Sequence, residues 1–153
     1  MAVQVEVPFS QSVRVTKKPA DVLAFLRDPS RNIPAHFPGI ESLTGAGAGT
    51  YDWNFKKIEY GGYSLTPKLL TRFEESSDQI TIVPQKKQGY SELTGHWRVL
   101  SEGTGSKIEF GIKLTMELPI PFFMKAMAAP VVQKELSKLF QRYLENVGKT
   151  LSQ

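Results

Sequence analysis

The sequence has no cysteine among its 153 residues. This absence excludes disulfide bonds, thiolate nucleophiles and cysteine-ligated metal sites, and it is typical of a protein in a reducing compartment. No stretch approaches the roughly 20 apolar residues that a membrane-spanning helix needs. Residues 1–20 also lack the basic start and the apolar run of a signal peptide. We therefore expect a cytoplasmic location.

The sequence also has only a small excess of charge of one sign. The 19 lysine and arginine residues face 15 aspartate and glutamate residues, which gives a formal net charge of +4. The sequence contains no arginine-rich tract and no nucleic-acid-binding motif. We expect no nucleic-acid partner, and we interpret the small excess as a solvated basic face.

The hydrophobic content of 41% and the charged content of 22% are ordinary for a globular protein. A chain of this length buries about 70% of its unfolded surface on folding. Because the sequence shows no internal repeat, linker or low-complexity segment, we treat residues 1–153 as a single domain.

The clearest predicted element is the C-terminal stretch of residues 121–153, in which the helical pattern is strongest after Pro130. Its apolar residues recur at steps of three and four, which places them on one stripe, while lysine, arginine and glutamate residues occupy the opposite face. Such a helix must lay its stripe on another surface. The stripe consists of Val132, Leu136, Leu139, Phe140, Tyr143, Val147 and Leu151.

Upstream of that helix, most segments alternate between apolar and polar residues, as strands do. A first strand covers residues 3–15, in which Pro8 indicates a sheet edge or a bulge. Pro19 begins a helix that ends at Asp28, and a second short helix covers residues 30–37. Six further strands follow through short turns, at residues 40–43, 51–58, 63–73, 80–82, 93–99 and 108–118.

This order of elements resembles the START-like helix-grip superfamily, which includes polyketide cyclases and dehydrases, lipid-transfer domains and plant pathogenesis-related proteins. The resemblance covers the whole chain and is also carried by Pro19–Leu26, His36–Ile40, Gly45–Gly49 and Gly95–Trp97. It implies an α+β helix-grip fold, in which a curved antiparallel sheet of about seven strands surrounds the long helix. It also implies an apolar ligand between sheet and helix, but it does not name that ligand.

Motifs for catalysis are scarce. The glycines of residues 45–49 precede a strand, whereas a phosphate-binding loop needs a lysine and a hydroxyl residue that open a helix, so we interpret this segment as a turn. His36 and His96 are the candidate acid–base groups, but His96 should point outward because Trp97 points inward. The two histidines lack an obvious third metal ligand. We expect no catalytic residue, no metal and no cofactor.

The inward faces of the predicted strands and helix are apolar and aromatic. Their only polar members are Gln11, Tyr51, Tyr63, Thr71 and Tyr143, with no carboxylate or arginine. This lining favours binding of a hydrophobic molecule, for which a pocket of roughly 300–1,000 Å³ is expected. The predicted ligand-binding residues are Trp53, Phe55, Tyr63, Leu65, Leu69, Trp97, Phe110, Ile112, Leu136, Phe140 and Tyr143.

Bulky apolar residues concentrate in residues 118–132, where the last strand passes into the helix. Because Pro130 removes a backbone hydrogen bond, the residues before it are predicted to move as a lid over the pocket, or to touch a membrane surface transiently beside Lys125. The predicted lid residues are Phe122, Phe123, Met124 and Met127.

The sequence thus predicts binding and transport of a hydrophobic small molecule, such as a lipid, quinone, isoprenoid or polyketide. Two alternatives stay open. One is a cyclase or dehydratase that acts on an enclosed polyketide-like substrate, and the other is an interaction module whose side chains fill a solid core. Periodicity alone does not distinguish a lined interior from a filled one.

Overall fold

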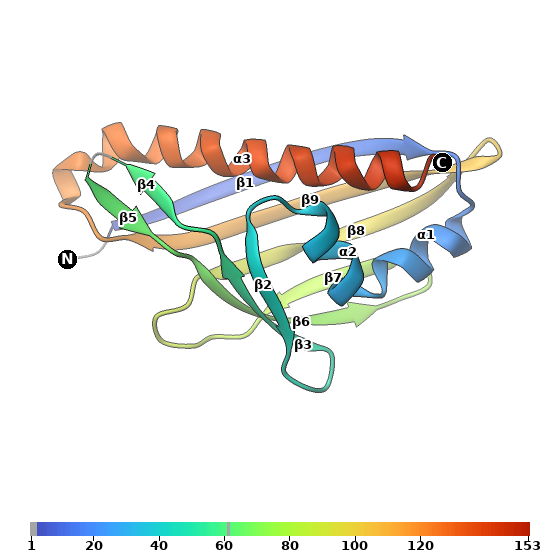
Figure 1. Cartoon of the computed structure of the whole chain (residues 1–153), viewed down its shortest axis with the longest axis horizontal. Helices are drawn as coiled ribbons and strands as arrows, with labels where there is room; N and C mark the ends of the chain where they lie inside the picture. Colours follow the sequence, from blue (N-terminus) through green and yellow to red (C-terminus); the bar gives the residue numbers. More distant parts are fainter. Residues whose placement is uncertain (1–2, 61) are drawn as a thin grey trace.

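The structure is a computed structural model that describes residues 3–60 and 62–153. Figure 1 shows a long C-terminal helix lying across a sheet, with two short helices near one end. The helices are α1 (Pro19–Leu26), α2 (Pro29–His36) and α3 (Lys125–Thr150), and a 3-10 turn, η1 (Phe122–Met124), precedes α3. The strands are β1 (Val3–Val15), β2 (Ile40–Gly45), β3 (Thr50–Phe55), β4 (Ile58–Tyr60), β5 (Tyr63–Leu65), β6 (Lys68–Glu75), β7 (Gln79–Pro84), β8 (Glu92–Glu102) and β9 (Gly105–Leu118).

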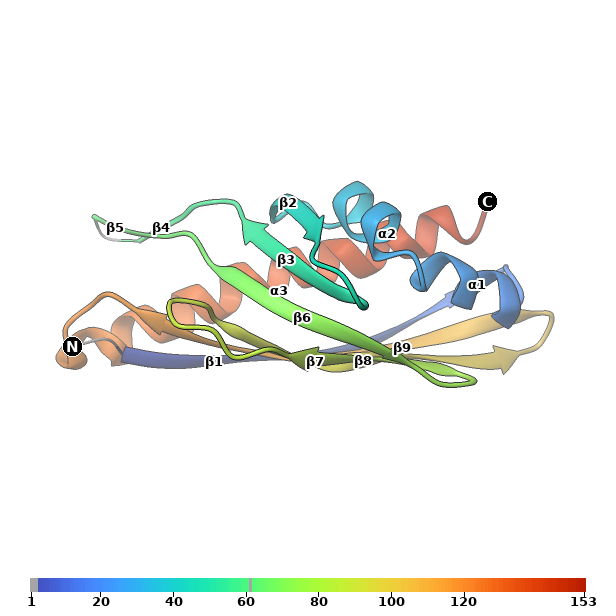
Figure 2. The ribbon, with the colours of Figure 1, turned by 90° about the horizontal axis from the view of Figure 1, so that it is seen from below.

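Seven strands form one antiparallel sheet in the order β1-β9-β8-β7-β6-β3-β2. Seen edge-on in Figure 2, the sheet curls, and the helices lie on its concave side. A curved seven-stranded antiparallel sheet around a long helix is the α+β helix-grip fold that the sequence predicts. This prediction is confirmed.

β1 lies at one edge of the sheet and pairs with β9 over its whole length. The register runs from Val3 opposite Leu118 to Val15 opposite Ser106 without a shift, so no bulge forms at Pro8. Proline has no backbone N–H, and an edge strand tolerates it because one side of the strand needs no partner. Of the two possibilities that Pro8 left open, the edge position is correct.

Two of the predicted strands, at residues 51–58 and 63–73, are each divided in the structure. β3 and β6 belong to the large sheet, whereas β4 and β5 form a separate two-stranded ribbon. The division follows from Pro67, which has no N–H to give to a neighbouring strand, although its carbonyl oxygen accepts a 2.9 Å hydrogen bond from the Phe55 N–H. Beyond this point the chain leaves the sheet, and the ribbon extends toward the N-terminal end of α3 (Figure 1).

α3 begins at Lys125, before Pro130, and continues through the proline. The long C-terminal helix that the sequence predicts is confirmed, and it includes the residues from Lys125 to Pro130. A proline leaves the carbonyl group four residues earlier without its helical partner. The helix tolerates this loss near its N-terminus because packing against the sheet, rather than the backbone hydrogen bonds alone, stabilises it.

Contacts near both ends hold α3 against β1. Gln133 Nε2 donates a 2.8 Å hydrogen bond to the Glu6 carbonyl oxygen, and the N–H of Lys17, just beyond β1, donates to the Leu151 carbonyl oxygen at 3.1 Å. Between these contacts the predicted stripe faces the core, with only Leu139 partly exposed. The buried members are Val132, Leu136, Phe140, Tyr143, Val147 and Leu151.

β8 crosses the sheet without a bulge, so Trp97 points into the core and His96 points to the outer face, as predicted. The His96 ring lies on that outer face over Gly111. The preceding residue, Gly95, has no room for a side chain, because a Cβ atom there would lie 2.2 Å from the Gly111 carbonyl oxygen. Glycine at this position therefore permits the close approach of β8 and β9.

We expect Gly95→Ala to lower the free energy of unfolding by about 1–3 kcal/mol, because the added methyl group would push two paired strands apart. Gly45→Ala is the matched control, since a Cβ there would meet only the Tyr51 ring, at 3.9 Å. Its effect should stay within about 0.5 kcal/mol. Urea denaturation followed by tryptophan fluorescence measures both variants, and equal midpoints would contradict the close approach.

Candidate functional site

Side chains fill the space between α3 and the sheet. The apolar cavity that remains at its centre has a volume of about 10 Å³, which is at the lower limit for a single water molecule. Aromatic rings occupy the rest: the Phe37 and Phe140 rings stack at 5.3 Å, and the Trp97 and Phe110 rings at 5.4 Å. Among the described residues, this central cavity is therefore far smaller than the pocket of roughly 300–1,000 Å³ that the sequence led us to expect between sheet and helix.

The predicted ligand-binding residues fall into three groups, and their role in binding stays a prediction. The central cavity is lined by the predicted Trp53, Trp97, Phe110, Phe140 and Tyr143, and by Ile33, Phe37, Ile82 and Leu93, which were not predicted. The surrounding core contains the predicted Phe55, Leu69, Ile112 and Leu136. The remaining two, Tyr63 and Leu65, lie apart on β5 beside the start of α3.

A chain of hydrogen bonds crosses this apolar interior. Trp97 Nε1 donates to the Tyr143 hydroxyl oxygen at 3.1 Å, and the Tyr143 hydroxyl donates to Asn32 Oδ1 at 2.8 Å. Asn32 is fully buried, and its Nδ2 has no hydrogen-bond partner among the described residues. The three residues come from β8, α3 and α2, so the chain connects three elements that meet at the cavity.

Asn32 does not belong to the predicted inward residues, which came only from the strands and the C-terminal helix. On α2, the residues Pro29, Asn32, Ile33 and His36 are spaced by three and four positions, so they share one face of the helix. Pro29 and Ile33 are buried, which identifies this face as the inner one. That spacing is the signal in the sequence that indicates an inward Asn32.

Burial raises the pKa of the Tyr143 phenol well above its usual range, although its hydrogen bonds with Asn32 and Trp97 act in the opposite direction. The hydroxyl therefore stays protonated at neutral pH and serves as a neutral donor and acceptor. The other buried polar side chains in the described part of the chain are Asn32, Thr71 and Ser106. Asn32, Thr71 and Ser106 are uncharged at neutral pH, so these buried polar groups and Tyr143 are all neutral there.

Neither histidine lines the central cavity. His36 Nδ1 contacts the Asn32 carbonyl oxygen at 2.7 Å and its Nε2 contacts Thr150 Oγ1 at 2.8 Å, which connects α2 to the end of α3. His96 lies on the outer face of the sheet. Within residues 3–60 and 62–153, no group of three or more histidine, cysteine or acidic side chains is placed to hold a metal ion.

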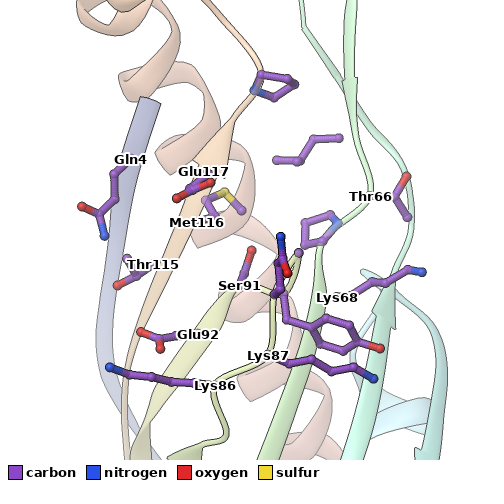
Figure 3. Close-up of a pocket in the computed structure, with 16 residues that line it drawn as sticks. Gln4, Thr66, Lys68, Lys86, Lys87, Ser91, Glu92, Thr115, Met116 and Glu117 are labelled. Carbon is purple, nitrogen blue, oxygen red and sulfur yellow. The ribbon is translucent and has the colours of Figure 1, made fainter. Parts of the chain in front are cut away.

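A much larger hollow lies where the sheet splits at one end. β7 ends at Pro84 and β8 begins only at Glu92, so β9 and β6 are separated there by an open cleft of about 780 Å³. Figure 3 shows the polar residues around this cleft, with turns of α3 behind it. Its charged and polar lining consists of Gln4, Thr66, Lys68, Lys86, Lys87, Gln88, Tyr90, Ser91, Glu92, Thr115 and Glu117.

A second apolar cavity, of about 20 Å³, lies next to this cleft, between the β4–β5 ribbon and the start of α3. Its inner wall includes Ala128 and Val132 of α3. Leu65 and Pro119 line both hollows. These two side chains therefore form the partition between the solvent-filled cleft and the layer between sheet and helix.

Three of the predicted lid residues face solvent: Phe122, Phe123 and Met127 are 78%, 81% and 69% exposed. Met124 is partly buried, and its Sδ accepts a hydrogen bond from the Tyr63 hydroxyl at 3.8 Å. The η1 turn thus contacts the β4–β5 ribbon through Met124 and presents two phenylalanine rings to solvent. Neighbouring exposed side chains of this size are typical of a contact surface.

The family described as polyketide cyclase / dehydrase and lipid transport matches residues 6–150. The chain belongs to this family, which confirms the predicted START-like relationship. A search of curated proteins finds no match.

Solved structures of the same fold cover nearly the whole chain, and at their low identity they show the fold alone. The Zhui aromatase/cyclase from Streptomyces sp. R1128 is 12% identical, with a TM-score of 0.67 over 97% of this chain and 94% of that one. A START superfamily protein from Mycobacterium smegmatis is 16% identical, with a TM-score of 0.65 over 95% and 99%. A STAR-related lipid transfer protein from Xanthomonas axonopodis is 14% identical, with a TM-score of 0.62 over 94% and 85%.

We expect Tyr143 to give no phenolate signal until the protein unfolds in alkali, because burial raises its pKa. Above about pH 10, the usual pKa of tyrosine, the unfolded chain ionises this phenol and the folded chain does not. The free energy of unfolding should therefore fall as the pH rises further, and it should fall less steeply in Tyr143→Phe.

Ultraviolet titration of the wild type and of Tyr143→Phe measures this effect. The two titrations should coincide until unfolding begins. An extra phenolate in the folded wild type near about pH 10 would contradict the burial of this hydroxyl.

Proposed function

We propose that this protein binds a hydrophobic small molecule, such as a lipid, quinone, isoprenoid or polyketide, between α3 and the concave face of the sheet, and transports it. The observation that carries the proposal is the lining of the central cavity, which is aliphatic and aromatic apart from the neutral polar groups of its tryptophans and Tyr143. Ligand sites typically combine apolar walls with a few placed polar groups. The description of the family, which includes lipid transport, supports the same class of function.

Binding in this space requires side chains to move, because a ligand needs roughly 300 Å³ or more. The ligand separates rings that now contact one another, above all the stacked rings of Phe37, which directly follows α2, and Phe140 on α3. Contacts to the ligand then replace contacts between rings. The same apolar area stays buried away from water. Replacing contacts between rings by contacts to the ligand therefore costs little hydrophobic free energy.

The ligand enters at the end of the sheet where the cleft lies. The β4–β5 ribbon is not part of the seven-stranded sheet, so it can move without breaking the hydrogen bonds of that sheet. Leu65 of the ribbon and Pro119 separate the cleft from the inner apolar cavity. Displacement of the ribbon therefore opens a path from solvent to the stripe of α3.

A cyclase or dehydratase that acts on an enclosed polyketide is the alternative function. Such reactions need groups that donate and accept protons near the substrate. The described interior offers Tyr143, which stays protonated, and the uncharged Asn32, Thr71 and Ser106. This inventory favours binding over catalysis.

The exposed lid residues support a transient contact with a membrane surface during loading or release of the ligand. Within residues 118–134 the only charged side chains are Lys125 and Lys134, so two cations and no acid accompany the exposed rings. This combination suits the interface of a bilayer that contains anionic lipids. None of the described helices is long and apolar enough to cross a membrane.

Trp97→Ala should weaken the binding of an apolar probe, such as a fatty acid or an environment-sensitive dye. It should also destabilise the protein by about 3–5 kcal/mol, because the ring is only 2% exposed. His96→Ala is the matched control, since it changes the next residue of the same strand on the outer face. It should leave both properties nearly unchanged.

Dye titration and urea denaturation measure these effects. The binding proposal fails if no apolar probe binds saturably to the wild type. If His96→Ala instead abolishes a measurable turnover, the enzyme function replaces the carrier function.

The double substitution Phe122→Ser with Phe123→Ser should reduce binding to vesicles that contain anionic lipid and should change the rate of ligand exchange. The melting temperature should change little, because both rings are exposed. Hydrogen exchange should be faster in residues 121–129 than in residues 132–147, and an apolar ligand should slow it selectively in the first segment.

Val131→Ser is the control for this experiment. Val131 lies on α3 beyond Pro130 and is 41% exposed, so its substitution removes a smaller exposed apolar group outside the lid. Equal exchange in the two segments, with vesicle binding and ligand exchange unchanged in the double variant, would refute the lid.

A further inference from the structure

Asn32 carries a buried hydrogen-bond donor without an acceptor. Its side chain is 0% exposed, and its Nδ2 has no partner in the part of the chain that the structure describes. Burying an amide N–H without a partner costs free energy, and folded proteins pair nearly all such groups. An unpaired donor in this position calls for an acceptor that the chain itself does not provide.

The hydrogen-bond pattern determines which end of the Asn32 amide is unpaired. Trp97 Nε1 donates to the Tyr143 oxygen, and the Tyr143 proton goes to Asn32 Oδ1. With the amide turned around, Oδ1 and the Tyr143 proton would both lose their partners, so the observed orientation leaves fewer groups unpaired. The free group is therefore an N–H donor, and its partner must be an acceptor.

The position of Asn32 connects this donor to the proposed ligand site. Tyr143, which Asn32 contacts, lines the central cavity, and so do Ile33 on α2 and Phe37, which directly follows α2. The remaining walls of the cavity are apolar. A molecule that fills this space brings an apolar body against the rings and a single polar atom toward α2.

We propose that Asn32 Nδ2 binds the uncharged carbonyl oxygen of an otherwise apolar ligand, such as a ketone, a quinone or an ester. The inference rests on the proposed function and narrows its ligand class. Tyr143 and Trp97 hold the amide in place by fixing Oδ1, so the donor is oriented before the ligand arrives.

The chemistry of the surroundings favours a neutral oxygen over a carboxylate. No lysine or arginine is among the buried residues that the structure describes, and a carboxylate in an apolar interior without a cation is strongly disfavoured. Lysine side chains do line the outer cleft, namely Lys68, Lys86 and Lys87. A ligand with an acidic group would therefore leave that group at the cleft rather than at Asn32.

Menadione, a naphthoquinone, and methylnaphthalene, its counterpart without carbonyl groups, form a matched pair of probes. The absence of cysteine prevents covalent addition of the quinone to a thiol. Equilibrium dialysis gives the affinity of each probe. The ratio of menadione affinity to methylnaphthalene affinity should fall about tenfold from the wild type to Asn32→Leu, because one hydrogen bond is lost at nearly constant side-chain volume.

Asn54→Leu is the control, since Asn54 lies on β3 outside the central cavity and bonds only to Ser42 Oγ. It should leave the affinity ratio unchanged. If the wild type and Asn32→Leu bind both probes with the same affinity ratio, the inference about Asn32 is overturned and the binding function stands. If neither probe binds saturably to the wild type, the proposed function fails and the inference fails with it.

A second measurement needs no variant at Asn32. In the nuclear magnetic resonance spectrum of the wild type, the Asn32 side-chain amide protons should move to lower field with menadione, because a new acceptor deshields them. Methylnaphthalene should not cause this shift. Equal shifts with the two bound probes would overturn the inference even if Asn32→Leu does not fold.

Discussion

Burial of the apolar stripe of α3 is the interaction on which the rest of the structure depends. A helix of 26 residues with such a stripe is not stable alone in water, so it must cover an apolar surface. The sheet curls to provide that surface, and the contacts of Gln133 and Lys17 position the helix along β1. The central cavity lies in the layer between them, where any ligand competes with the protein's own side chains.

Hydrogen bonding sets a second condition within that layer, because buried polar groups there need partners from the protein. The buried indole of Trp53 donates to Thr71 Oγ1 at 2.8 Å, and that of Trp97 donates to Tyr143 at 3.1 Å. Each bond lets a large ring lie at the centre without leaving its N–H unpaired. Asn32 differs from both tryptophans, because its Nδ2 has no partner in the described part of the chain. Its donor is therefore the one that we propose for the ligand.

The architecture could be predicted wherever one periodic pattern covers a whole element, as in β1, β9 and the stripe of α3. The alternating pattern did not predict the effect of Pro67, which divides a strand that the pattern indicates as continuous. The filled interior also could not be predicted. Alternation indicates the direction in which a side chain points, but it does not indicate how close that side chain lies to those on the opposite surface. Phe37 lies directly after α2, at the end of the predicted second helix, and no periodicity there indicates that its ring stacks on Phe140 at the centre.

The position of Pro8 in β1 has a consequence for contacts between molecules. An edge strand of 13 residues offers its free backbone groups to strands of other chains, which is a common route to aggregation. Because pairing with β9 continues past Pro8 without a shift, the proline nitrogen faces the free edge and interrupts its row of donors. A strand from another molecule could therefore pair without interruption only with the segment on one side of Pro8. In this way the proline protects the protein against aggregation in concentrated solution.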